Sequence, residues 1–497
     1  MSEHFITRTE AESDLLACAA FLAERIKSID GHAEAMLAVI PLYLQKGDVD
    51  LAAELSNTVD DPFTRDRLLT LVAEKCADMA DDDYALQLAE AVEDHGIRGQ
   101  ALERVALRQA ARGEFDRARE IAGQLAHPDA VLAGIAINQA NKGDDAAAAE
   151  TIGQISFPGA AVTAFDEMAL ASLQRSDSAK AVEHLDNAVD QAGNIEQPEE
   201  KSRAYCDIGN AFIDAGRNDK AIESFNKAKA TAESIGGVHR DSFLALAAQG
   251  FLRAGSLELA DRTLDLVVDK TQIATTLLGF SRELWRKDER DEAIESLEES
   301  LAMLESQHER ETRDSRARFR LFTQIAGQFA GFEKGERAIE VAENIKDDGE
   351  KTSALSQIAA ILTMREEDEQ ARHALRAIGE DGDRVFALIG MGDAKEKNGD
   401  RAGALELLDE AAALADSVPQ FVMRSLAYSN LADRFGRMEE DERFTAAIRQ
   451  ALETIAMIRD ESARATSLAS VSTVAHNLGL ELPEEERVYL TQILSAK

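Results

Sequence analysis

The sequence is poor in cysteine, proline and aromatic residues. Its 497 residues include only 3 Cys and 7 Pro, and 5% are aromatic. The three cysteines, Cys18, Cys76 and Cys206, lie far apart without disulfide or metal-ligand spacing, which predicts a reducing, cytoplasmic compartment. Scarce proline and long stretches of Ala, Leu, Glu and Arg favour helix almost throughout, because these residues lose little rotamer freedom in a helix.

Basic residues are also few compared with acidic ones. The chain has 55 Lys and Arg against 93 Asp and Glu, which gives a formal net charge of -38 at pH 7. Phosphate binding needs a positive surface, so this charge argues against nonspecific binding to nucleic acid. The sequence has no run of about 18 apolar residues, and we therefore expect no membrane insertion.

Sequence motifs of catalysis and cofactor binding are missing as well. There is no Gly-rich phosphate loop, no GxSxG elbow and no HExxH motif, and the nine histidines are separated from one another. The acidic run at Asp81–Asp83 lacks the ligand spacing of an EF-hand loop. These absences predict a protein that is not an enzyme and that has no cofactor and no metal site.

Small residues recur at regular spacing along the chain. The most frequent spacing in the first column is 33 residues, and its members are Ala52, Ala85, Ala118, Ala148, Ala181, Ala221, Ala260, Ala293, Ala338, Ala371 and Ala404. A second column lies twelve residues upstream, is small in ten of eleven cases, and comprises Ile40, Ala73, Ala106, Ala136, Ala169, Gly209, Ala248, Ser281, Ala326, Ala359 and Gly392. Small residues let two helix axes approach closely, so the columns predict the two helices of a repeated helix-turn-helix unit.

Turn residues fit these units. Glycine stands five residues before the alanine in six units, where a chain leaving a helix often needs positive φ, at Gly47, Gly113, Gly143, Gly216, Gly255 and Gly399. Pro62, Pro158 and Pro198 are placed to begin first helices. Pro41 falls inside a first helix, where it predicts a kink or an early break.

The ends of the array and its irregular spacings give further expectations. Thr9 and Glu12 read as a capping box that opens a helix to about Ser28, within an N-terminal capping segment 1–32 whose outer face should be polar. The repeat array should cover 33–480, and 481–497 should form a C-terminal capping helix. Wider spacings after Ala181 and Ala293 predict longer helices or longer connections, and Gly436 is expected in a late turn.

One stretch carries a family signature. Within Ser202–Ala228 the sequence IGNAF is similar to the LGNAY signature of the tetratricopeptide repeat (TPR) family, and the family's small, turn and bulky positions are matched by Gly209, Gly216, Ala221, Phe225 and Ala228. The chain thus resembles TPR proteins. The resemblance implies an all-α fold, a right-handed α-α superhelix (TPR-like solenoid) of about twelve helix-turn-helix units.

Two candidate contact sites for a partner follow. The resemblance places Asn210 where TPR proteins clamp a peptide, although it is also an ordinary consensus residue. In His308–Arg320, a helix would set Arg313, Arg316 and Arg320 on one face. These guanidinium groups could bind carboxylates or phosphates bidentately, or pair with the nearby acids Glu309, Glu311 and Asp314.

Together these features predict a noncatalytic scaffold or regulator that binds a protein or peptide segment in the concave groove of the solenoid. The acidity of the chain favours basic partner segments. Two alternatives stay open: a structural protein that self-associates through its end helices, and an enzyme subunit that holds a small ligand. The oligomeric state is not predicted.

Overall fold

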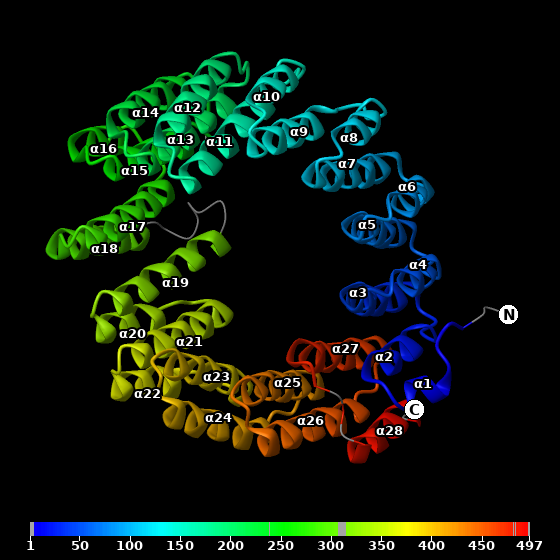
Figure 1. The fold of residues 1–497 in the computed structure, drawn as a ribbon. Coiled ribbons are helices and arrows are strands. Elements are labelled where there is room, and N and C mark those ends of the chain that lie inside the picture. Colours follow the sequence, from blue (N-terminus) through cyan, green and yellow to red (C-terminus); the bar gives the residue numbers. More distant parts are fainter. Residues whose placement is uncertain (1–3, 238, 307–314, 481, 483, 496–497) are drawn as a thin grey trace. The chain divides into compact units, whose positions relative to one another are not determined.

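The computed structural model describes residues 4–237, 239–306, 315–480, 482 and 484–495, and Figure 1 shows their ribbon. Within these residues every regular element is a helix and no strand occurs, which confirms the all-α prediction. Helices alternate as first and second members of consecutive hairpins. Twelve such hairpins, α3/α4 to α25/α26, lie in the described part of the chain, as the spacing predicts.

The first helices are α3 (Ile29–Lys46), α5 (Pro62–Asp78), α7 (His95–Arg112), α9 (Asp129–Asn141), α11 (Pro158–Gln174), α13 (Pro198–Asp214), α15 (His239–Arg253), α17 (Lys270–Arg286), α19 (Ser315–Gly331), α21 (Asp348–Met364), α23 (Asp381–Lys397) and α25 (Phe421–Arg437). The second helices are α4 (Val49–Asn57), α6 (Asp82–Ala91), α8 (Phe115–Ala122), α10 (Asp145–Ile152), α12 (Ser178–Gly193), α14 (Asn218–Glu233), α16 (Leu257–Leu264), α18 (Arg290–Glu305), α20 (Gly335–Glu343), α22 (Asp368–Ala377), α24 (Arg401–Ala415) and α26 (Asp441–Ala456). The hairpins are flanked by α1 (Arg8–Ala11), α2 (Leu15–Ala23), α27 (Glu461–Leu478), a 3₁₀ turn at Glu484–Glu486 and α28 (Arg487–Ser495).

The alanine column forms the buried seam of the hairpins. All eleven alanines lie on second helices and have 0% exposed surface. Gly209 shows why the partner column is small: a Cβ at this position would lie 2.6 Å from the ring of Phe225. Gly250 approaches the same ring, and an added Cβ there would lie 2.2 Å from it. The missing side chains therefore make room for one buried phenylalanine.

Each turn within a hairpin contains one residue with positive φ. The six predicted glycines have φ between 72° and 89°. In the remaining hairpins the equivalent residue is not glycine but is held in the same left-handed region, at Ala80, Ser176, Asp288, Glu333, Glu366 and Glu439. The last of these corrects one expectation, because Glu439 rather than Gly436 makes the turn between α25 and α26.

The wide spacings come from long second helices. Helices α12, α14 and α18 each have 16 residues, whereas α10 and α16 have 8. About two extra turns of helix account for the additional residues after Ala181 and Ala221 and for most of those after Ala293. Pro62, Pro158 and Pro198 each begin a first helix, as predicted. The early break predicted at Pro41 is wrong, since α3 continues through it to Lys46.

The start of the chain differs from its prediction. The capping box is formed by Thr7 and Glu10, two residues earlier than predicted, and it opens only the single turn of α1. Asp14 then caps a separate helix, α2, by accepting a hydrogen bond from the backbone N of Ala17 at 2.7 Å. Seven of the nine residues of α2 are buried, so this helix lacks the polar outer face expected of a terminal cap.

The described chain forms two compact units. Unit 1 comprises 1–105 and 352–497, and unit 2 comprises 106–351. In unit 2 the first helices contact one another in order from α9 to α19. In unit 1 the corresponding row is α23, α25, α27, α3 and α5. We call these two rows the first-helix layers of the units.

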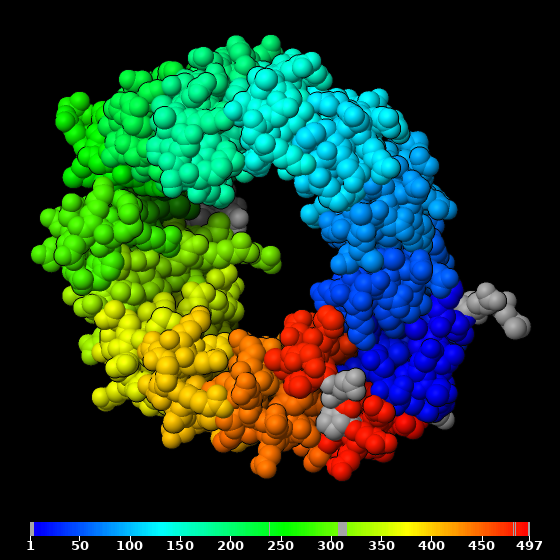
Figure 2. Space-filling model, in the orientation of Figure 1, coloured from blue at the N-terminus to red at the C-terminus, as the bar shows by residue number. Residues whose placement is uncertain are grey.

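Residues from both ends of the sequence complete unit 1. Helix α27 follows the last hairpin, α25/α26, and is not the first member of another hairpin among the described residues. Helix α2 packs against both α27 and α3. This arrangement matches that of α4, which packs against α3 and α5. The same proximity is visible in Figure 2, where the blue N-terminal residues touch the red C-terminal ones. Helix α2 therefore takes the place of the second helix of α27.

No helix in the described residues combines the length and the apolar character needed to cross a membrane.

Candidate functional site

A hollow of about 270 Å³ in unit 1 is lined by residues of α3, of α5 and of the part of α7 that precedes residue 106. Its apolar lining, which we call its floor, comprises Leu37 from α3, Leu71 from α5 and Ile97 from α7, and its polar lining includes Arg67 and Gln100. These side chains come from three hairpins, so the 33-residue repeat brings them together. We call this feature the α3/α5/α7 hollow.

Phe63 and Arg67 form one wall of the α3/α5/α7 hollow. Asp61 accepts a hydrogen bond from the backbone N of Thr64 at 2.8 Å and Pro62 begins α5, which fixes Phe63 in the exposed first turn. The Phe63 side chain is 60% exposed, and the guanidinium carbon of Arg67 lies 5.8 Å from its ring centroid. Arg67 makes no ion pair with the residues that the structure describes.

This combination has a definite binding chemistry. An exposed aromatic ring and an apolar floor can cover an apolar side chain, and an uncompensated guanidinium can donate hydrogen bonds to a carboxylate or to backbone carbonyl groups. Arg104, which also lines the hollow, already forms an ion pair with Glu74 at 2.8 Å. Arg67 is thus the cation available to a ligand in this hollow.

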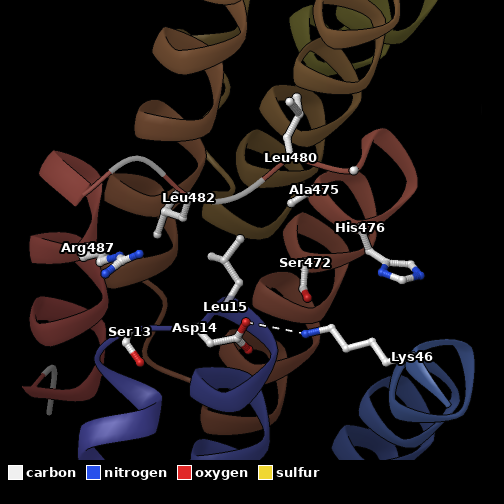
Figure 3. A pocket seen from close by; sticks show the side chains of 11 residues that line it. Ser13, Asp14, Leu15, Lys46, Ser472, Ala475, His476, Leu480, Leu482 and Arg487 are labelled. Atoms are coloured by element: carbon white, nitrogen blue, oxygen red, sulfur yellow. Dashed lines mark hydrogen bonds and ion pairs between the residues drawn. The ribbon is translucent and has the colours of Figure 1, made fainter. Parts of the chain in front are cut away.

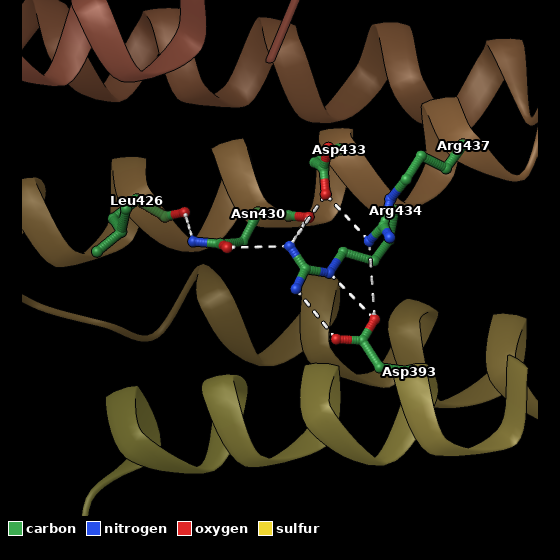
Figure 4. A network of polar contacts seen from close by, with 6 residues as sticks. All are labelled: Asp393, Leu426, Asn430, Asp433, Arg434 and Arg437. Atoms are coloured by element: carbon green, nitrogen blue, oxygen red, sulfur yellow. Dashed lines mark hydrogen bonds and ion pairs between the residues drawn. The ribbon is translucent and has the colours of Figure 1, made fainter. Parts of the chain in front are cut away.

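Polar pairs join neighbouring first helices elsewhere in the layers. Figure 4 shows such a network in unit 1, where Asp393 of α23 accepts hydrogen bonds from Arg434 of α25 at 3.1 and 3.0 Å. Arg434 also donates to the side-chain oxygen of Asn430 at 3.1 Å. Asp393 directly follows the small residue Gly392, which is the position that Asn210 takes after Gly209. Residues at this position can therefore serve to tie successive hairpins together.

The beginning of α25 presents an apolar surface next to this network. Four large apolar side chains of its first six residues are exposed: Phe421, Val422, Met423 and Leu426. The backbone oxygen of Leu426 accepts a hydrogen bond from Asn430 Nδ2 at 2.9 Å, which links this surface to the polar pairs. Sequence periodicity alone did not single out this surface or Phe63.

Two carboxyl groups on neighbouring first helices of unit 2 have raised pKa values. Burial raises the pKa of Asp166 on α11 to about 6, and the negative charge of Asp207 on α13 adds to this increase. Burial also raises the pKa of Asp207, although Arg203 opposes this shift. The first-helix layer of unit 2 thus contains carboxyl groups that bind protons more tightly than free carboxyl groups do.

The three cysteines are free and buried. Burial raises the pKa of the Cys76 thiol to about 11 and that of Cys206 to about 12, and it also raises the pKa of Cys18. None of them is therefore a ready thiolate nucleophile. Among the described residues, no three His, Cys, Asp or Glu side chains gather as metal ligands.

Comparison with protein families adds a decisive observation. A family model described as "Tetratricopeptide repeat" matches residues 202–234, a hairpin at the centre of unit 2. The same hairpin pattern repeats twelve times in the described residues. The chain is a TPR-like helical repeat protein. No curated protein matches it.

Among solved structures, this TPR-like chain is similar to yeast Tom70, with 14% identity, a TM-score of 0.28, and coverage of 90% of this chain and 97% of Tom70. It is also similar to Ton1535 from Thermococcus onnurineus NA1, with 16% identity, a TM-score of 0.25 and coverage of 72% and 99%. A Rap protein complexed with competence and sporulation factor gives 13% identity, a TM-score of 0.27 and coverage of 78% and 97%.

Asn210 lies on α13, and its side chain already has a partner in the TPR-like chain. Its amide oxygen accepts a hydrogen bond from Arg253 of α15 at 2.7 Å, and Arg253 lies 3.7 Å from Asp214. The bond joins adjacent first helices in the same manner as the pair Asp393 and Arg434. A peptide contact by Asn210 stays a prediction, and such a contact would have to share or displace Arg253.

The predicted arginine face is only partly described. Arg313 lies outside the described residues, as do the predicted acidic partners Glu309, Glu311 and Asp314. Arg316 and Arg320 lie on α19. Arg320 is 70% exposed at its side chain and lies 3.6 Å from Glu350 of α21, a partner that sequence proximity could not indicate. Binding of a partner by these arginines stays a prediction.

Arg318, between Arg316 and Arg320, has a structural role that the sequence analysis did not assign. It is buried, and its Nη2 donates a hydrogen bond to the backbone oxygen of Leu304 at 2.9 Å. The bond fastens α19 to the end of α18. Arg384 makes a comparable bond to Ile378 at 2.8 Å, so this use of arginine recurs in the repeat.

Proposed function

We propose that this chain is a noncatalytic protein-interaction scaffold that binds a partner segment along its first-helix layers. The observation that carries the proposal is the α3/α5/α7 hollow, where exposed Phe63 and available Arg67 stand beside an apolar floor. Contact sites of this kind, with an aromatic and an arginine anchor around an apolar pocket, contribute most of the binding energy at protein interfaces.

The partner segment should match the chemistry of the hollow. We expect one apolar side chain to enter between Leu37, Leu71 and Ile97, and a carbonyl or carboxylate group of the segment to accept hydrogen bonds from Arg67. A segment that extends beyond the hollow would meet further first helices. The exposed apolar residues at the start of α25 offer a second contact surface in unit 1.

The negative charge of the chain should favour partner segments that also carry basic residues outside the part bound in the hollow. The net charge of the chain is -38, and on the first helices of unit 2 the charge of Asp207 contributes to the raised pKa of Asp166. Association with a basic region would be steered by this field and weakened by salt. We further propose a cytoplasmic location, which the three free thiols support.

The packing of α2 disfavours self-association through the N-terminal end helix, whereas α28 at the other end still exposes Val488. Helices α2 and α27 pack on each other within unit 1, so their apolar faces are covered in the folded chain. A protein-binding layer therefore accounts for more of the exposed apolar residues than association through these helices does.

A peptide selection tests the proposal. A display library of random linear peptides is selected on the wild-type chain and, in parallel, on Phe63→Ala and Arg67→Gln variants. The proposal predicts that peptides sharing an apolar residue near an acidic or amide residue are enriched on the wild type. Enrichment should fall on both variants, because each removes one anchor of the hollow.

The matched control is Arg203→Gln, which removes one arginine from the first-helix layer of unit 2, where Arg203 is 74% exposed at its side chain. Selection on this variant should recover the wild-type peptides. A peptide set that is unchanged by the Phe63 and Arg67 substitutions would refute the hollow as the binding site, and the failure to enrich any peptide would refute segment binding.

A further inference from the structure

A second cavity, separate from the α3/α5/α7 hollow, lies where residues from the two ends of the sequence meet in unit 1. It has a volume of about 500 Å³ and opens between α2, α3, α27 and α28, as Figure 3 shows. Asp14 and Leu15 come from the start of α2 and Lys46 from the end of α3, whereas His476 and Arg487 come from α27 and α28. A volume of this size is typical of small-molecule sites.

Three groups that can carry positive charge line this cavity, against a single carboxylate. Lys46 Nζ lies 3.5 Å from Asp14 Oδ2, a long contact that engages the one acid among the described lining residues. Arg487 makes no ion pair with the described residues, and its buried Nε has no hydrogen-bond partner among them. A guanidinium group that lines a cavity and has no carboxylate partner can attract an anionic ligand and donate charge-assisted hydrogen bonds to it from its terminal nitrogens.

The middle of the cavity is apolar. Leu15, Ala475 and Leu482 are buried side chains of the wall, and Figure 3 shows Leu15 and Leu482 between Arg487 on one side and Lys46 and His476 on the other. A fully hydrated inorganic ion would leave this apolar wall uncovered. A ligand with an apolar body and an acidic group would cover the wall and reach a cation at the same time.

We propose that this cavity binds a small organic anion, with its acidic group at Arg487 and its apolar body over Leu15 and Leu482. The proposal is independent of peptide binding by the first-helix layers. The ligand would touch residues from both ends of the sequence, so its binding also strengthens the packing of α2 on α27. In a chain with a net charge of -38, such a site is a local exception that gives selectivity for one anion.

Titration calorimetry with 2-naphthoate and its neutral analogue 2-naphthamide tests the charge requirement. We expect saturable binding of 2-naphthoate with a dissociation constant of about 1 mM or lower, and binding of 2-naphthamide that is about tenfold weaker or absent. Arg487→Gln should weaken 2-naphthoate binding about tenfold, since it replaces charge-assisted hydrogen bonds with neutral ones. Lys397→Gln, which removes an exposed cation of α23 outside the cavity, should leave binding unchanged.

Two further measurements keep the test decisive. Leu480→Asp places a carboxylate at the exposed rim, and it should weaken 2-naphthoate binding even if Arg487→Gln unfolds the chain. Hydrogen exchange should show that 2-naphthoate protects α2 and α27 in the wild type. Absence of saturable binding, equal binding of 2-naphthamide, equal binding by the Arg487→Gln and Leu480→Asp variants, or protection confined to other helices would each overturn the proposal.

Discussion

Ser462 donates a hydrogen bond from its hydroxyl to Glu34 Oε2 at 2.8 Å, although 428 residues separate the two in sequence. The bond joins α27 to α3, which are neighbours in the first-helix layer of unit 1. Gly31, one turn before Glu34, would bring an added Cβ to 3.4 Å from the Ser462 Cβ, so the two helices approach closely here. The α27–α3 contact thus resembles the contact between consecutive first helices.

The first prediction concerns α2 as the second helix of α27. Leu16 has 0% exposed surface, and Leu16→Ala should reduce the free energy of unfolding by about 2–5 kcal/mol because it leaves a cavity. Hydrogen exchange by mass spectrometry should become faster in α27 as well as in α2. The distant effect follows because α2 packs directly on α27.

The matched control for this prediction is Leu185→Ala in α12, a leucine of unit 2 that also has 0% exposed surface. It should cost a similar amount of free energy and leave exchange in α27 unchanged. If hydrogen exchange in α27 is as slow in the Leu16→Ala variant as in the wild type, α2 does not support this helix.

The second prediction concerns the turn at Glu439, which has φ 55° and an exposed side chain. A residue with a Cβ is strained in this conformation by about 1–2 kcal/mol, whereas glycine is not. Glu439→Gly should therefore stabilise the chain by up to about 1 kcal/mol, after the larger loss of glycine entropy is included. Glu439→Ala keeps the Cβ and should give no such gain in thermal or urea unfolding.

The third prediction concerns the packing around Phe225. Gly250→Ala would place a methyl group 2.2 Å from the Phe225 ring, so it should destabilise the chain by about 1–3 kcal/mol through overpacking. Phe225→Leu in the same chain should recover part of that loss, because the smaller side chain makes room for the methyl group. Additive effects in this double-mutant cycle, measured by urea unfolding, would contradict direct contact.

The fourth prediction concerns pH. The pKa of Asp166 is raised to about 6 in the folded chain by burial and by Asp207, whereas an unfolded Asp titrates near 4. The folded chain therefore holds this proton more tightly, and the group's contribution to stability is present below about pH 4 and is lost as the pH rises through about 6. Asp166→Asn should remove this loss of stability at high pH, because asparagine does not titrate.

At pH 7 we expect Asp166→Asn to be more stable than the wild type by about 1–2 kcal/mol, a value reduced for partial exposure to solvent. Urea unfolding at pH 4 and pH 7 measures the difference. A gain from Asp166→Asn that is the same at both pH values would contradict the raised pKa.

The repeat was predictable because its determinants are local and periodic. Small residues such as Ala118 and Ala221 lie where the two helices of one hairpin cross, and Gly216 makes the left-handed turn between two helices. Both features depend on a single hairpin and not on its position in the array. The equivalent turns at Asp288 and Glu439 carry no glycine, so their left-handed conformation is imposed by the hairpin and is invisible in residue type.

The candidate sites were less predictable because they depend on contacts between hairpins. Arg67 follows Phe63 by one helical turn, a spacing that suggests contact, but only the fold shows that both face Leu37 and Ile97. Likewise, the partner of Asn210 is Arg253, 43 residues away. The packing of α2 on α27 has no signal in the repeat period, since α2 precedes the first hairpin.

The most direct test of the account is the affinity of one selected peptide for the wild-type chain and for the Phe63→Ala, Arg67→Gln and Arg203→Gln variants, measured by calorimetry. Binding through the α3/α5/α7 hollow predicts that the first two substitutions each weaken binding about tenfold, which corresponds to about 1.4 kcal/mol, and that the third has no effect. Equal affinity of the Phe63→Ala and Arg67→Gln variants and the wild type would contradict the proposed site.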